Sequence, residues 1–155
     1  MLHLAAAQAS VQPIATADIS RAHLDHALTL RETQTLAFLR SRAVMVRVAP
    51  RVEPFHFCAL IETNPHLAAE AYADGALHVL PKAIGRPVVF RRDGAQAPSF
   101  DESWVLGILA ACDRDDEASV RFGVAARCAA AFRRPLAFLF KGLASRLDEV
   151  AGTLS

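Results

Sequence analysis

The chain has 155 residues, of which 53% are hydrophobic and 21% are charged, and its formal net charge is +1. This length and composition suit one domain that buries a core of its own. The near balance of acidic and basic residues excludes a strong overall attraction to nucleic acid, to a membrane surface or to an acidic substrate. Any such partner would have to bind a local patch.

The cysteines and the first residues of the chain favour an intracellular protein. The three cysteines form no C-x-x-C pair, and an odd number cannot all be closed into disulfides within one chain. No Lys or Arg precedes Arg21, so the basic region of a secretory signal is missing. No run reaches the roughly 18 uninterrupted apolar residues of a membrane span. We therefore expect a soluble protein of the cytoplasm without a membrane partner.

In the N-terminal part of the chain, residues 17–40 contain no Pro or Gly and predict one long helix or two. Asp18 and Ser20 are the candidate N-caps. The apolar residues of 17–40 form only a diffuse stripe. The sequence leaves helix or strand open for three further segments, which are 44–48, 55–61 and 87–92. For the second of these a buried helix is the favoured interpretation.

Asn64 and Pro65 form an N-cap and first-turn pair, which predicts the start of a short helix. We expect this helix to end near Asp74, because Gly75 can close it. A further turn or short helix is expected over 76–84. The Gly- and Pro-containing stretch 85–98 then predicts a loop that connects two halves of one domain, 17–84 and 99–150.

The clearest signal of the sequence is a capping box at Ser99. Ser99 lies three residues before Glu102 and directly before an apolar run. It predicts a helix over 100–112 with Trp104 facing the core. Acidic residues over 113–117 then supply an N-cap for a second helix.

Pro135 is expected to end the preceding helix and to begin a third one, which has the strongest amphipathic stripe of the sequence. The members of this stripe are Leu136, Leu139, Phe140, Leu143, Leu147 and Val150. Phe138 departs from the stripe and projects to the opposite side of the helix. We therefore predict Phe138 as an interface residue, covered either by the N-terminal half or by another subunit.

Taken together, these elements predict a mainly α fold, with a compact helical domain and a C-terminal three-helix unit packed on the long N-terminal helix. One small β-hairpin is compatible with the segments left open, and an α+β fold is the alternative.

A search for catalytic constellations identifies only sparse candidates. His23 and His26 lie three residues apart in an expected helix, so their imidazoles can converge on a metal, but no third ligand follows at a fixed spacing. Whether His56, His66 and His78 line a pocket is left open. No nucleophile motif and no phosphate-binding loop is present, and the cysteines fall on apolar faces. We expect no cofactor.

The densest basic run of the chain comprises Arg40, Arg42, Arg47 and Arg51, and such a run could bind phosphates. No aromatic residues interleave with it and no helix-turn-helix pattern follows it, which favours a solvated face over a nucleic-acid interface.

By elimination, the sequence favours a non-enzymatic protein-interaction or regulatory module that forms a homo-oligomer or binds another protein. The alternative is a nucleic-acid-binding regulator that uses the Arg40 to Arg51 run. The third hypothesis is a small metal-dependent enzyme built on His23 and His26.

Overall fold

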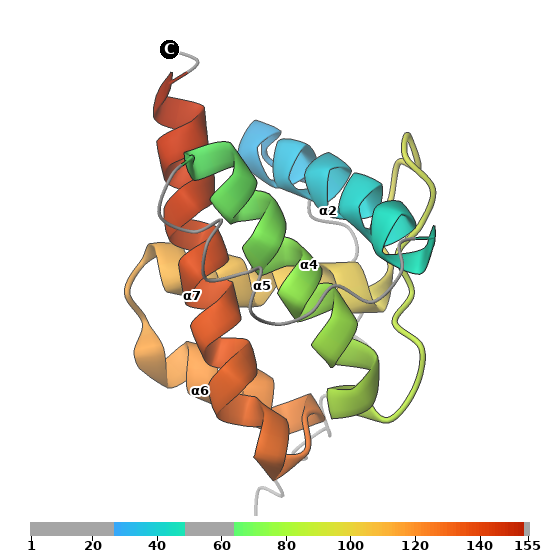
Figure 1. Ribbon diagram of the computed structural model, residues 1–155, viewed down its shortest axis with the longest axis vertical. Coiled ribbons are helices and arrows are strands. Elements are labelled where there is room, and N and C mark those ends of the chain that lie inside the picture. Colours follow the sequence, from blue (N-terminus) through green and yellow to red (C-terminus); the bar gives the residue numbers. More distant parts are fainter. Residues whose placement is uncertain (1–26, 49–63, 154–155) are drawn as a thin grey trace, which may run out of the picture.

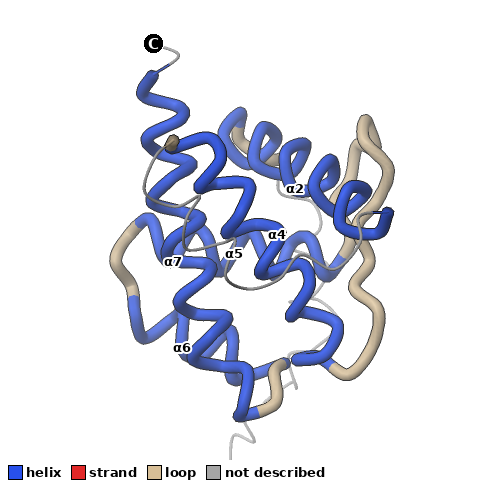
Figure 2. The backbone as a smooth tube through the Cα atoms, in the orientation of Figure 1, coloured by secondary structure: helices blue, strands red, loops and turns tan. Residues whose placement is uncertain are grey.

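The computed structural model describes residues 27–48 and 64–153, and these residues form five helices (Figure 1). The helices are α2 (Leu30–Val48), α4 (Pro65–Ile84), α5 (Phe100–Asp113), α6 (Glu117–Arg127) and α7 (Ala130–Thr153). The described residues outside these helices form loops, and the described ranges contain no strand (Figure 2). The predicted mainly α fold is confirmed. None of these helices has both the length and the apolarity that crossing a bilayer requires.

The core lies where α4 and α7, the pair of helices in most extensive contact, meet α5 and α6 (Figure 1). Helix α2 lies along the edge of this group and packs on α4 and α5. The largest fully buried apolar side chains come from four of the five helices: Leu80, Val105, Val120, Val124, Leu136, Phe140 and Leu143. The core is thus shared between both halves of the chain.

Two glycines allow α4 and α7 to approach each other closely. A Cβ atom placed on Gly142 would lie 2.3 Å from Cε1 of Tyr72, and one placed on Gly75 would lie 3.2 Å from a methyl group of Leu139. The prediction that Gly75 ends a helix is therefore wrong. Residues 76–84 continue the same helix to Gly85, whose φ of 81° closes it.

The predicted capping box of α5 is confirmed. Ser99 Oγ accepts a hydrogen bond from the backbone N–H of Glu102 at 3.1 Å, and the Glu102 carboxylate accepts from the backbone N–H of Ser99 at 2.7 Å. Trp104 packs against the edge of the core, and its Nε1 donates to the carbonyl of Gly123 at 3.0 Å. The predicted N-cap of α6 is also confirmed, since Asp116 accepts from the N–H of Ser119.

Helix α2 begins with a second capping box that the sequence analysis did not identify. Thr29 Oγ1 accepts from the N–H of Glu32, and the Glu32 carboxylate accepts from the N–H of Thr29. The helix then runs through 44–48, a segment that the sequence left open between helix and strand. No strand forms at 87–92 either, where the chain is a loop. The candidate N-caps Asp18 and Ser20 and the segment 55–61 lie outside the described residues.

The predicted break at Pro135 is wrong, because α7 begins five residues earlier, at Ala130. The chain turns instead at Cys128, whose φ and ψ of −107° and 138° are extended. Pro135 lies in the second turn of α7, where its missing N–H removes one hydrogen bond of the helix without ending it. The predicted stripe is confirmed: Leu136, Phe140 and Leu143 are buried, and Leu139 and Leu147 pack against the core.

Candidate interaction surface

The first turn of α5 holds two consecutive buried carboxylates, Asp101 and Glu102, which are 2% and 0% exposed. Glu102 forms a bidentate ion pair with Arg40 at 2.8 and 3.1 Å. It also accepts hydrogen bonds from the backbone N–H groups of Ser99 and Arg91, each at 2.7 Å. Burial raises the pKa of Glu102, but the hydrogen bonds from Arg40, Ser99 and Arg91 outweigh this effect and the pKa is lowered.

Asp101 is held in the same way by a second set of partners. Arg86 and Arg127 donate to its carboxylate at 2.8 and 2.5 Å, and the backbone N–H of Val89 donates at 2.8 Å. The hydrogen bonds from Arg86 hold the pKa of Asp101 well below its usual range. The guanidinium of Arg127 also stacks on the ring of Trp104, 4.8 Å from its centroid.

These contacts join α2, the loop after α4 and the end of α6 to one turn of α5. We call the buried carboxylates Asp101 and Glu102, together with the arginines that pair with them, the buried charge cluster; of these arginines Arg40 is buried, Arg127 is half-buried and Arg86 is exposed. Its carboxylates already accept hydrogen bonds from charged and backbone donors, and their pKa values are lowered. Such groups are poor proton acceptors at neutral pH, so the cluster has the properties of a structural network.

The structure separates the residues of the predicted basic run. Arg40 is buried against Glu102, and Arg42 pairs with Asp74 at 2.8 and 2.5 Å. Arg47 is exposed near the end of α2, and Arg51 lies outside the described residues. The guanidinium of Arg40 is therefore not available to a phosphate group, and the members of the run that the structure describes do not share one exposed surface.

The predicted metal candidates His23 and His26 lie outside the described residues, as does His56. His66 is exposed and His78 is half-buried on α4. Within residues 27–48 and 64–153, no three His, Cys, Asp or Glu side chains gather in a way that could hold a metal ion. Burial raises the pKa of the Cys112 thiol to about 11 and also raises that of Cys128, so both thiols are protonated at neutral pH.

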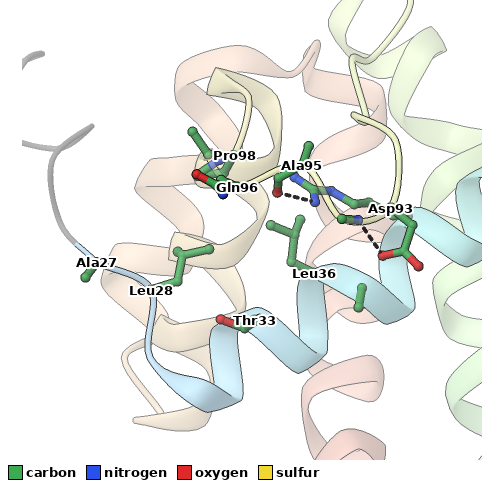
Figure 3. Close-up of a pocket in the computed structure, with 12 residues that line it drawn as sticks. Ala27, Leu28, Thr33, Leu36, Asp93, Ala95, Gln96 and Pro98 are labelled. Atoms are coloured by element: carbon green, nitrogen blue, oxygen red, sulfur yellow. Dashed lines mark hydrogen bonds between the residues drawn. The ribbon is translucent and has the colours of Figure 1, made fainter.

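The hollow shown in Figure 3 lies between α2 and the loop 93–98 and has a volume of about 600 Å³. Leu28, Thr33 and Leu36 line one side. The loop residues Asp93, Ala95, Gln96 and Pro98 line the other. Arg40 also lines the hollow, but its guanidinium donates to the carbonyl of Ala95 at 2.9 Å and to Glu102. Its charge is thus already compensated.

A second hollow, of about 430 Å³, lies between α2, α4 and α7. Phe38, Ala69, Leu147 and Val150 provide its apolar lining, and His66 is one of its polar residues. His66 thus lines a pocket, which the sequence left open. The lining combines these apolar side chains with the polar residues Arg31, Gln34, Thr35, His66 and Glu70.

The most unusual surface is the side of α2 that faces away from the core. Leu30, Val44, Met45 and Val48 are 76%, 56%, 49% and 74% exposed. The residues between them on this side, Thr33, Gln34, Ala37 and Ser41, are exposed and uncharged. At about 100° per residue, these eight residues lie opposite Leu36, Leu39 and Ala43, which are buried. We call the eight residues the outer face of α2.

Phe138 is 64% exposed, as expected for a residue that departs from the buried stripe of α7. Its ring meets the edge of Tyr72 at a centroid distance of 6.0 Å, so one side of the ring rests on α4. Phe122 on α6 is 77% exposed. The sequence analysis identified Phe138 but missed the outer face of α2, because that helix has apolar residues on two sides and its stripe therefore looked diffuse.

Comparison with known proteins adds no assignment, since no family model, no curated protein and no solved structure matches the chain.

Proposed function

We propose that this chain is a non-enzymatic protein-interaction module that self-associates. The observation that carries the proposal is the outer face of α2, where four large apolar side chains stay in water along the whole length of one helix. The opposite side of the same helix already contributes to the core. Burying one such side chain fully contributes about 1.5–3 kcal/mol, so a partner that covers this face gains binding free energy.

The chemistry of the remaining described residues supports a non-enzymatic role. The two buried carboxylates, Asp101 and Glu102, are engaged by arginines and backbone N–H groups. The thiols of Cys112 and Cys128 have raised pKa values. Neither pair of groups is suited to act as a general base or a nucleophile at neutral pH.

Phe138 offers a second contact, on α7 and apart from the outer face of α2. Because its ring already rests on Tyr72, it loses little freedom when a partner covers its exposed side. We propose that it contributes to assembly through this side, as the sequence predicted.

Light scattering across a series of protein concentrations tests the proposal. We expect the mass of the wild-type particle to rise with concentration, and we expect Phe138→Ser to reduce the mass reached at the highest concentrations. Phe122→Ser is the matched control, because Phe122 is also an exposed phenylalanine but lies on α6. A wild type that stays monomeric at every concentration would contradict self-association. Equal effects of the two variants would remove the specific role of Phe138.

A further inference from the structure

We infer that the partner of the outer face of α2 is a second copy of the same helix, which lies antiparallel to the first across a two-fold axis between Ala37 and Ser41. This inference rests on the proposed self-association and names the surface that performs it. It leaves Phe138 free for a contact with a further molecule.

The first argument is charge. The outer face of α2 contains no charged residue over its eight members, whereas Arg31 and Arg47 lie on the flanks of the helix. A face without charge buries no unpaired ion when it meets an identical face. The net charge of +1 also produces little repulsion between two copies. A strongly acidic or basic partner would find no complementary charge there.

The second argument is that the face is self-complementary. Its residues are arranged symmetrically about position 39, with Leu30 and Val48 at the two ends and Ala37 and Ser41 beside the centre. In an antiparallel pair, each Leu30 therefore meets Val48 of the partner subunit. The small residues Ala37 and Ser41 meet at the crossing point, where they allow the helix axes to approach to about 8 Å.

The third argument is the spacing of the face. Six of its members, at positions 30, 34, 37, 41, 44 and 48, alternate between steps of four and three residues. This is the spacing of a coiled-coil seam. The seam is about 27 Å long at 1.5 Å per residue, which is sufficient for contact over five turns. Such an interface is small, so we expect a dimer with a dissociation constant in the micromolar range.

Sedimentation velocity of the full chain with charge placed on the face tests the inference. Val44→Glu introduces one carboxylate per copy into the proposed contact and should raise the dissociation constant about a hundredfold or more. Phe122→Glu is the matched control, because it places the same charge at another exposed apolar position, on α6. It should sediment as the wild type does. Circular dichroism establishes whether each variant is folded. If Val44→Glu is unfolded, Ser41→Glu takes its place in the experiment.

The outcomes separate this inference from the proposed function. A folded Val44→Glu that dimerises like the wild type overturns pairing through α2 but leaves self-association intact. Loss of the dimer in both Val44→Glu and Phe122→Glu also overturns pairing through α2, because the effect is then not specific to that helix. A wild type that is monomeric at high micromolar concentration overturns both proposals.

Cross-linking of cysteine variants tests the antiparallel arrangement. Ser41→Cys places two thiols with an axial offset of about 6 Å, whereas Thr33→Cys places them about 18 Å apart along the axis. A short bifunctional maleimide should therefore join two copies of Ser41→Cys but not two copies of Thr33→Cys. A mixture of Thr33→Cys and Met45→Cys should be joined, because these positions face each other. The wild type with its native cysteines gives the background. Efficient joining of Thr33→Cys to itself would overturn the antiparallel order.

Discussion

The first turn of α5 buries charged side chains, whereas the outer face of α2 exposes apolar ones. In α5, Asp101 and Glu102 are buried, although carboxylates are rarely found inside proteins. In α2, Leu30 and Val48 are about three quarters exposed. The difference shows that burial here follows the partners available to each group. The carboxylates have arginines and backbone donors around them, while the large apolar side chains on the outer face of α2 lie outside the core cluster of the described residues.

The two regions should therefore control different properties. The buried charge cluster joins α2, α5, α6 and the loop after α4, so changes in it should alter the free energy of unfolding. The outer face of α2 contributes nothing to the core of its own chain, so changes in it should alter association. The predictions that follow test this separation, beginning with the largest expected effect.

Glu102→Gln should cause the largest loss of stability. It leaves the guanidinium of Arg40 buried without a charged partner, which costs about 3–5 kcal/mol. Urea denaturation measures this loss. Glu117→Gln is the matched control, because Glu117 pairs with Lys141 at the surface and the loss of stability should be much smaller. Similar losses in the two variants would show that the buried cluster does not differ from a surface ion pair.

Acid should weaken the fold but not the contact through α2. The pKa of Asp101 in the folded protein lies below its ordinary value of 3.8. Its contribution to stability is therefore complete at neutral pH and is lost progressively as the pH falls below 3.8 toward the pKa of the folded state. The free energy of unfolding should therefore decrease between about pH 5 and pH 2, and Asp101→Asn should make this decrease smaller. The outer face of α2 has no titratable side chain. A dissociation constant that changes strongly between about pH 7 and pH 5, where the fold is intact, would contradict the separation.

Apart from the control Glu117→Gln, Ser99→Ala should have the smallest effect of these variants on stability, a loss of about 1–2 kcal/mol. The sequence alone predicts the N-cap contribution. The structure adds that Ser99 Oγ donates to the carbonyl of Val89 at 2.5 Å, so the variant also leaves this carbonyl without its partner. Thermal or urea unfolding gives the value. A loss below about 0.5 kcal/mol would show that neither the cap nor the second hydrogen bond contributes.

The sequence was sufficient for much of the C-terminal half, because the signals there are local. The capping box at Ser99, the N-cap at Asp116 and the stripe from Leu136 to Leu147 each depend on residues a few positions apart. Pro135 was misinterpreted because a proline in the second turn of a helix is tolerated when tertiary packing supports that helix. Gly75 was misinterpreted because its role is the close approach of α7, which lies more than sixty residues away in the sequence.

The candidate surfaces were less predictable for the same physical reason. The ion pair between Arg40 and Glu102 joins residues 62 positions apart, so no local pattern distinguishes Arg40 from a solvated arginine. The outer face of α2 was hidden because two apolar sides of one helix weaken the amphipathic signal. Phe138 could be identified, since it departs from a stripe that was already clear.

The concentration dependence of urea unfolding tests the separation between the two regions most directly. If association through α2 adds to a monomer that is already stable, the unfolding midpoint of the wild type should rise with protein concentration. The midpoint of Val44→Glu should depend much less on protein concentration and should lie near the value that the wild type reaches when dilute. A wild-type midpoint that does not change with concentration, or a Val44→Glu midpoint well below that of the dilute wild type, would contradict the account.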